Sequence, residues 1–184
     1  MLYFEKYGKV LMHSSIASDS DPMRAVADNL ANARFDVANR LFLRLYQASN
    51  LMHKTGTRAV ARHGATTQQW AVMGALSRPG ARERGMTVKE LIGFLMVSRQ
   101  NLTGVLARLE DLGLVERVRG AEGDGRLRHV RLTPDGERVW TDMLADIRRY
   151  YDDALDGFSL DECVLLFRLL DRLRDSLGAL PSPE

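Results

Sequence analysis

The sequence predicts a mainly helical protein with one small β ribbon. Apolar residues recur at three- to four-residue spacing through most of the chain, as helices require. Two segments, 115–119 and 128–133, alternate apolar and polar residues around the glycine-rich stretch GAEGDGR, a pattern typical of a hairpin. A length of 184 residues with 45% apolar residues suits one domain, or one domain with an appended dimerisation element.

Helical signals organise the N-terminal part of the chain. Residues 1–23 form an extension that ends in the polar stretch SDSDP. A long helix is expected over about 24–62, where apolar residues keep helical spacing without a proline. Thr66 or Thr67 then caps a helix through TTQQWAVMGALSR, and a Pro-Gly pair stops it.

Two capped helices joined by a tight turn follow. Thr87 and Glu90 form a Thr-x-x-Glu capping box, Ser98 caps the second helix, and Gly113 ends it. Four leucines of the second helix are predicted to face inward: Leu102, Leu106, Leu109 and Leu112. The opposite face carries side chains that reach bases or phosphates, and mid-helix Gly104 costs about 1 kcal/mol relative to Ala, which close approach to DNA explains.

The ribbon that follows is strongly basic. Val118, Val130 and Leu132 are predicted to face inward, and the arginines to be solvated. Residues 117–131 hold five arginines against only Glu122 and Asp124, a repulsion that a polyanion relieves. The helix alone is equally consistent with an ordinary amphipathic helix and a solvated polar face, but helix and ribbon together favour binding of double-stranded DNA.

The C-terminal part of the chain is helical and acidic. Residues 1–138 hold 21 Lys and Arg against 14 Asp and Glu, whereas residues 139–184 hold 5 against 10. Thr133-Pro134 restarts a helix, and a last helix over 159–178 is apolar on more than one side, so it needs two partners. This pattern predicts a homodimer interface, the alternative being packing within one chain.

Other chemistry is sparse in this sequence. The single cysteine, Cys163, excludes an intramolecular disulfide and sits among leucines as a buried apolar residue does, although an oxidation sensor is an alternative. No histidine has metal-ligand spacing, no phosphate loop or nucleophile–base pair is present, and no cofactor is expected. No apolar run is long enough to span a membrane, and a cytoplasmic location is expected.

The order of these motifs resembles one known family. Paired helices, GLVER, a hairpin with Asp124-x-Arg126 and then LTPDG are similar to the multiple antibiotic resistance regulator (MarR) family of winged helix-turn-helix proteins. The resemblance covers about residues 34–178. It implies dimerisation helices at 24–63 and 139–178 around a DNA-binding domain at 64–138.

The resemblance also implies how such a protein binds DNA. Family members are homodimers whose recognition helices enter successive major grooves and whose wings enter the flanking minor grooves. Arg126 is then the expected minor-groove contact, and Asp124 braces it. The remaining expected DNA-binding residues are Ser98, Arg99, Gln100, Asn101, Thr103, Arg108, Arg119 and Arg128. The chain departs from the family in its longer N-terminal extension and in Gly104, where a longer side chain is common.

Many family members release DNA when a small ligand binds. One face of the first long helix carries a basic stripe without interleaved acids: Arg40, Arg44, Gln47, Leu51, Lys54, Arg58 and Arg62. The stripe is either a solvated face, or one that meets acidic C-terminal residues, or a wall that binds an anion. With Tyr46, Trp70 and Met73 nearby, the last alternative indicates an aromatic acid or its coenzyme A thioester, as in the family branch that senses aromatic acyl-coenzyme A. Trp70 on its own reads as a core residue.

These observations predict a dimeric, ligand-responsive transcriptional repressor that binds a pseudo-palindromic operator. A constitutive DNA-binding protein without an effector is the alternative. A winged helix reused in an enzyme or a protein-interaction module is a third, less supported interpretation.

Overall fold

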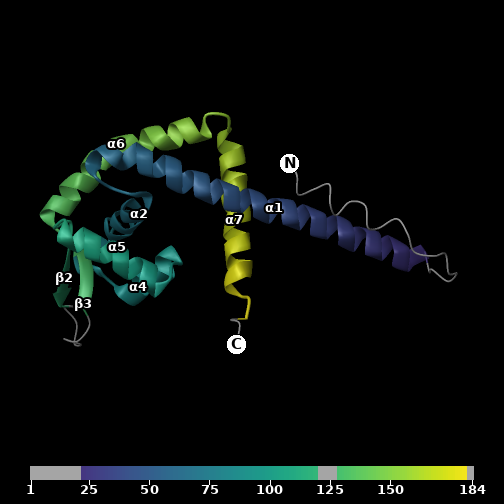
Figure 1. Ribbon diagram of the computed structural model, residues 1–184, viewed down its shortest axis with the longest axis horizontal. Helices are drawn as coiled ribbons and strands as arrows, with labels where there is room; N and C mark the ends of the chain where they lie inside the picture. The colour runs from purple at the N-terminus through teal and green to yellow at the C-terminus, as the bar shows by residue number, and fades with distance from the viewer. Residues whose placement is uncertain (1–21, 120–127, 182–184) are drawn as a thin grey trace. The chain divides into compact units, whose positions relative to one another are not determined.

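The computed structural model describes residues 22–119 and 128–181, with side chains from residue 29 onward. Its elements alternate between helices and a few short strands (Figure 1). In chain order they are α1 Pro22–Val60, the 3₁₀ turn η1 Ala61–His63, α2 Thr67–Leu76, α3 Ala81–Arg84, β1 Met86–Thr87, α4 Val88–Leu95, α5 Arg99–Asp111, β2 Val115–Arg119, β3 Arg128–Leu132, α6 Pro134–Leu155 and α7 Leu160–Gly178. The mainly helical fold with a small β element is confirmed.

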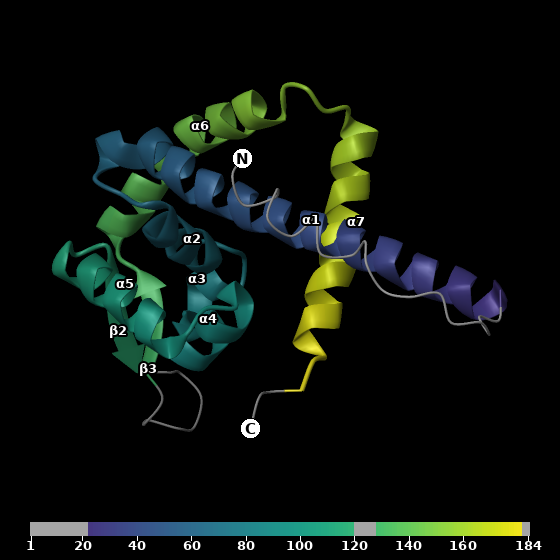
Figure 2. The ribbon, with the colours of Figure 1, turned by 45° about the vertical axis from the view of Figure 1, so that its right-hand side comes forward.

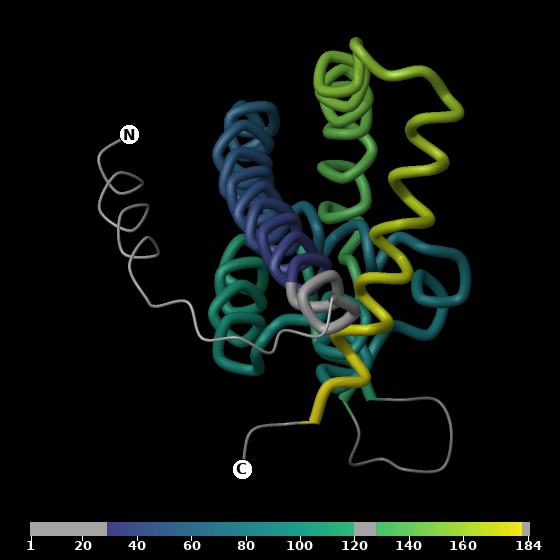
Figure 3. The backbone as a smooth tube through the Cα atoms, turned by 90° about the vertical axis from the view of Figure 1, so that its right-hand side faces the viewer, coloured from purple at the N-terminus to yellow at the C-terminus, as the bar shows by residue number. Residues whose placement is uncertain are grey.

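Internal contacts divide the chain into two units, residues 1–48 and 49–184. In its described part the first unit is the N-terminal portion of α1. The second unit holds the end of α1 and every later element. Within it the helices α2 to α5 and the strands gather into one body (Figure 2), and the chain turns between α6 and α7 (Figure 3).

Side-chain caps set the helix boundaries as the sequence predicted. The Thr66 hydroxyl accepts a hydrogen bond from the Gln69 backbone amide, and the Gln69 side-chain oxygen accepts one from the Thr66 backbone amide. Thr66 rather than Thr67 is therefore the N-cap of α2. The box between Thr87 and Glu90 is likewise complete at the start of α4. Both helices therefore begin at residues that the sequence alone identifies.

The β element has three strands rather than the two expected. It is antiparallel in the order β1-β3-β2, and β1 contributes only two residues, which is too short to show alternation in a sequence. The four-residue helix α3 was also not predicted. It lies between Gly80 and Gly85, both at positive φ, where the sequence indicated only a stop.

Two predicted inward faces need correction. Val118 pairs with His129, so it lies on the face opposite to Val130 and is only half-buried. Leu112 is the C-cap of α5 and is 57% exposed. Val105 completes the buried face of α5 instead. Leu112 lies on the same side as Val105, two turns later, but it is exposed because α5 has already ended at Asp111.

One continuous core holds the second unit together. Its fully buried side chains come from the end of α1, from α2, α4, α5 and β3, and from α6. The largest of them are Met73, Leu76, Leu91, Leu102, Leu106, Leu109 and Met143. Each such side chain stabilises the fold by about 1.5–3 kcal/mol relative to exposure.

The LTPDG segment, residues 132–136, holds the end of α5 against the start of α6. The Thr133 hydroxyl donates to the Gly113 carbonyl at 2.6 Å and accepts from the Gly136 amide at 3.0 Å. The Thr133 amide donates to the Leu114 carbonyl at 3.1 Å. A Cβ on Gly136 would stand 2.0 Å from that same carbonyl oxygen, so only glycine fits there.

We predict that Gly136→Ala destabilises the protein by about 3 kcal/mol, because α6 must move away from backbone atoms that cannot yield. Urea unfolding measures the change. Gly178→Ala is the matched control, since a Cβ at Gly178 meets nothing within 4 Å. A Gly136→Ala variant as stable as this control would show that the close approach does not exist.

Candidate DNA-binding surface and effector pocket

The helix α5 presents one buried and one open face. The Ser98 hydroxyl caps it by accepting from the Asn101 amide at 3.2 Å. The buried face consists of Leu102, Val105, Leu106 and Leu109. The six residues expected to face the major groove are all exposed: Ser98, Arg99, Gln100, Asn101, Thr103 and Arg108. Nothing lies within 4 Å of where a Cβ on Gly104 would stand, so this face is unobstructed.

The strands beside α5 carry exposed arginines, some of them paired. Arg117 forms an ion pair with Glu110 of α5. Arg131 pairs with Glu116 across the strands at 2.8 Å. The negative charges of Glu110 and Glu116 offset part of the repulsion among the arginines of the strands. That repulsion is therefore smaller than the sequence of residues 117–131 alone indicated. Arg119 and Arg128 are exposed at the end of the strand pair, whereas Asp124 and Arg126 lie outside the described residues.

Two hollows lie against α5. The first, which we call the polar groove, has a volume of about 220 Å³ between the start of α2 and the open face of α5. Its lining residues are Thr66, Gln68, Gln69, Gln100, Asn101, Gly104, Val105 and Arg108.

The second hollow, which we call the apolar pocket, has a volume of about 290 Å³. It is lined by the end of α1, by α2, by the end of α4 with the turn after it, and by α5. Its lining residues are Met52, His53, Thr67, Gln68, Ala71, Val72, Leu95, Val97, Asn101, Leu102 and Val105. Small-molecule sites share this composition of apolar walls with a few convergent polar groups.

The residues predicted for effector binding do not gather around this pocket. Arg40, Arg44, Lys54 and Arg58 are exposed along α1, and Tyr46 is exposed as well. Trp70 and Met73 belong to the core, where they are 9% and 0% exposed, and Trp70 packs against Tyr150 and Tyr151. None of these seven residues lines the polar groove or the apolar pocket.

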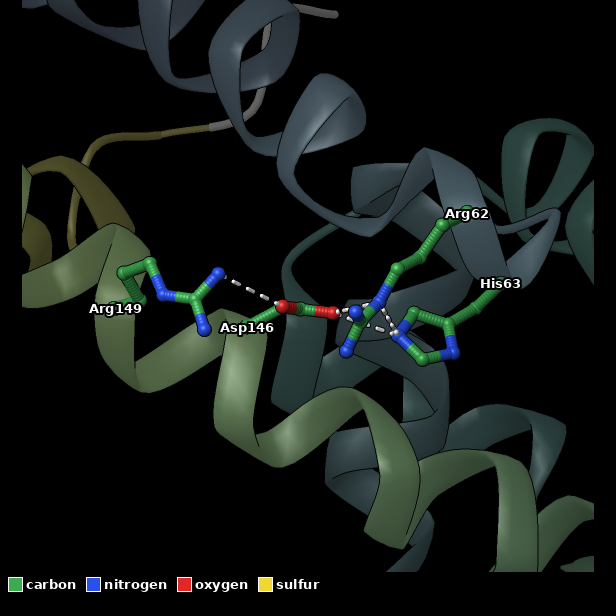
Figure 4. Close-up of polar contacts among 4 residues, drawn as sticks. All are labelled: Arg62, His63, Asp146 and Arg149. Atoms are coloured by element: carbon green, nitrogen blue, oxygen red, sulfur yellow. Dashed lines mark hydrogen bonds and ion pairs between the residues drawn. The ribbon is translucent and has the colours of Figure 1, made fainter.

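A polar cluster ties η1, the turn that follows α1, to α6 (Figure 4). Asp146 of α6 is buried, with a side chain 7% exposed, and it forms ion pairs with Arg62 and with Arg149. His63 Nε2 lies 2.8 Å from the same carboxylate. The hydrogen bond from His63 and the charge of Arg62 hold the pKa of Asp146 below its usual value. Arg62 of the basic stripe therefore meets an acidic C-terminal residue.

Two other kinds of site were sought among the described residues, namely a metal site and a membrane-spanning helix. Among them no group of three His, Cys, Asp or Glu side chains stands close enough to hold a metal ion. Within those same ranges no helix is both long and apolar enough to cross a bilayer.

An exposed polar helix seated in a helix-turn-helix and flanked by basic strands defines a winged helix-turn-helix protein. The MarR family pattern matches residues 63–127. The transcriptional activatory protein BadR of Rhodopseudomonas palustris is 48% identical over 159 residues, which cover 85% of this chain and 89% of that protein. The chain therefore belongs to the MarR family of DNA-binding transcriptional regulators and is not an enzyme.

Two further similarities are to other transcriptional regulators. The homoprotocatechuate degradative operon repressor of Escherichia coli is 30% identical over 112 residues, covering 61% of this chain and 72% of that protein. The PcaV transcriptional regulator from Streptomyces coelicolor, solved in complex with its natural ligand, has a TM-score of 0.60 and 28% identity, covering 76% of this chain and 92% of that one.

We predict that Gly104→Ala stabilises the protein by about 1 kcal/mol, through higher helix propensity, and weakens DNA binding about tenfold through steric contact. Thermal unfolding and fluorescence anisotropy with an operator duplex measure the two effects. Gly93→Ala in α4 is the control, since a Cβ there also meets nothing within 4 Å. This variant should be more stable than wild type and should bind the operator duplex with unchanged affinity. Unchanged affinity of Gly104→Ala would place the DNA elsewhere.

The Asp146 cluster predicts an acid-sensitive stability. A carboxyl whose pKa is lowered on folding stabilises the protein above its unfolded-state pKa, and this contribution is lost as the pH falls through the folded-state pKa. Asp146→Asn should lower the free energy of unfolding at neutral pH and flatten its decline in acid. Asp142→Asn, an exposed carboxyl one turn earlier, is the control. Parallel acid declines in wild type and Asp146→Asn would contradict the assignment.

Proposed function

We propose that this protein is a homodimeric MarR-family regulator whose affinity for operator DNA is changed by a small aromatic acid bound in the apolar pocket. One observation carries the proposal: the recognition helix itself supplies part of the pocket wall, through Asn101, Leu102 and Val105. A ligand in the pocket therefore touches the element that reads DNA. A constitutive DNA-binding protein has no need of such a hollow behind its recognition helix.

The chemistry of the pocket supports an aromatic acid. A volume of about 290 Å³ holds one substituted ring, and the apolar walls favour burying it. His53, Gln68 and Asn101 offer groups that can hydrogen-bond a carboxylate or a ring hydroxyl. Homoprotocatechuate, named in the description of the relative from Escherichia coli, is an aromatic acid of this kind.

A coenzyme A thioester would need a second binding surface beside the apolar pocket for its nucleotide. Its nucleotide is too large for the apolar pocket and has to remain outside it. Lys54 and Arg58 are exposed on α1 just after the pocket residues Met52 and His53. In this form of the proposal the acyl ring enters the pocket and these cations contact the phosphates, so the thioester binds more tightly than the free acid.

The DNA-binding role is assigned to α5 and the wing. The exposed face of α5 enters the major groove, and Arg119, Arg128 and Arg126 contact the flanking backbone and minor groove. The partner is double-stranded DNA with a pseudo-palindromic operator, because a two-fold dimer places two copies of α5 one helical turn apart. A protein that binds chromosomal operators acts in the cytoplasm.

The dimer is proposed from two helical segments that expose apolar side chains, α7 and the part of α1 in the first unit. No residue of α7 is buried, and its exposed apolar side chains include Val164, Leu165, Leu166, Phe167, Leu169 and Leu170. The first unit also exposes apolar residues of α1: Leu30, Phe35, Val37, Leu41, Phe42 and Leu43. Exposed apolar surfaces of this extent mark protein interfaces.

The sign of regulation has two candidates. The sequence led to a repressor, and the relative from Escherichia coli is named as one. BadR, which is more similar and covers more of the chain, is named as an activator. A reporter gene under the operator, measured with and without this protein, distinguishes them, since deletion of a repressor raises expression and deletion of an activator lowers it.

We predict that an aromatic acid among benzoate, 4-hydroxycinnamate, homoprotocatechuate and their thioesters raises the melting temperature by roughly 5–10 °C at a hundredfold excess over Kd. Ala71→Leu fills the apolar pocket from an exposed position and should abolish the shift. Arg40→Ala with Arg44→Ala is the comparison, and it should respond normally. If only the arginine variant loses the rise in melting temperature, the effector binds at the basic stripe and not in the apolar pocket.

Sedimentation equilibrium at micromolar concentration is expected to give twice the 20.7 kDa chain mass. Leu166→Glu with Leu170→Glu, one turn apart on α7, should produce monomers that bind a palindromic operator weakly, because charge replaces the apolar contact. Arg168→Glu, between them, is the control and should remain dimeric. Monomeric wild type with tight palindrome binding would refute the dimer.

A further inference from the structure

The polar groove and the apolar pocket are neighbours and share three lining residues. Gln68 of α2 and the pair Asn101 and Val105 of α5 line both hollows. On either side of them the lining differs: Leu102 borders the apolar pocket alone, whereas Arg108 borders the polar groove alone. The three shared residues therefore border both the apolar pocket and the polar groove.

We propose that Gln68 and Asn101 couple the two hollows. An anionic ligand in the apolar pocket turns their amide groups inward, and the same amides are then lost to DNA phosphate at the polar groove. This inference rests on the proposed function, because it requires the apolar pocket to be the effector site.

The apolar pocket has few polar groups that could bind a carboxylate. Four of its lining residues are polar: His53, Thr67, Gln68 and Asn101. The Thr67 hydroxyl is already engaged, since it donates to the His53 carbonyl at 2.9 Å and lies 2.9 Å from the Thr57 hydroxyl. A carboxylate entering the pocket therefore finds the His53 ring and the two amides. Two of these three groups also belong to the DNA-facing groove.

The backbones that carry the two amides are held firmly. Thr66 and Gln69 cap the first turn of α2, and the Thr67 amide donates to the Thr57 hydroxyl at 3.2 Å. Ser98 caps the first turn of α5 at the Asn101 amide. Ligand binding in the pocket can thus redirect side chains without unwinding either helix.

The side chains of Gln68 and Asn101 are free to turn. Both residues are exposed, and neither side chain hydrogen-bonds to another residue in the described ranges. The last torsion of an amide side chain has broad minima, so reorientation costs little. Each amide carries its two N–H donors on one nitrogen, so a side chain turned toward an anion in the apolar pocket directs both donors away from the polar groove. Competition between carboxylate and phosphate for the same donors makes ligand and DNA oppose each other, and linkage makes this effect reciprocal.

The coupling is measured as the ratio of operator Kd with and without saturating homoprotocatechuate, or whichever aromatic acid of the panel shifts the wild-type melting temperature. Fluorescence anisotropy on the full-length chain gives both constants with an operator duplex selected in vitro. A ratio of about tenfold is expected for wild type. Gln68→Leu should reduce it to about threefold, and Gln68→Leu with Asn101→Leu should bring it to one.

Gln100→Leu is the matched control, because Gln100 lines the polar groove but not the apolar pocket. It should weaken DNA binding while leaving the ratio near tenfold. Calorimetry must show that each variant still binds the acid, since the ratio is read at saturation. If the double leucine variant binds acid and DNA with the full wild-type ratio, the coupling proposal is overturned and the effector pocket stands. If wild type shows no melting shift with any acid or thioester, the proposed function fails and this inference fails with it.

Discussion

The hydroxyl of Thr133 bridges the end of the recognition helix and the first turn of α6. It donates to the Gly113 carbonyl and accepts from the Gly136 amide, while the Thr133 backbone pairs with Leu114. These contacts hold the strand pair, α5 and α6 in one body, because β3 runs directly into the junction. The direction in which α5 presents its polar face follows from this corner. The absence of a side chain at Gly136 is what allows the approach.

Local chemistry made much of this fold predictable. Caps at Thr66, Thr87, Ser98 and Thr133 involve only residues within one turn, so a single sequence reveals them. The errors arose where packing decides. Val118 alternates correctly along its strand, yet which face is buried depends on the register with β3.

The residues of the candidate effector pocket were harder to predict from the sequence than the fold was. The apolar pocket exists because four helices meet around it, and its residues span positions 52 to 105 without a shared periodicity. Gln68 gave no signal, as an exposed glutamine beside a cap is unremarkable. The basic stripe was visible because it lies on one helix, and its role as an anion site stays a prediction. Its cations do not line the cavity that tertiary contacts form. The open polar face of α5 was found because the apolar spacing of the same helix implies it.

The polar cluster between η1 and α6 bears on which substitutions this protein tolerates. Arg62, His63 and Arg149 converge on the single carboxylate of Asp146. The basic partners are redundant: replacing any one of them leaves two others for the acid. The acid has no substitute, since its removal leaves positively charged groups facing one another across two elements. Drift among related sequences should therefore be asymmetric here, with the basic positions varying one at a time and the acidic position varying only when its surroundings change with it.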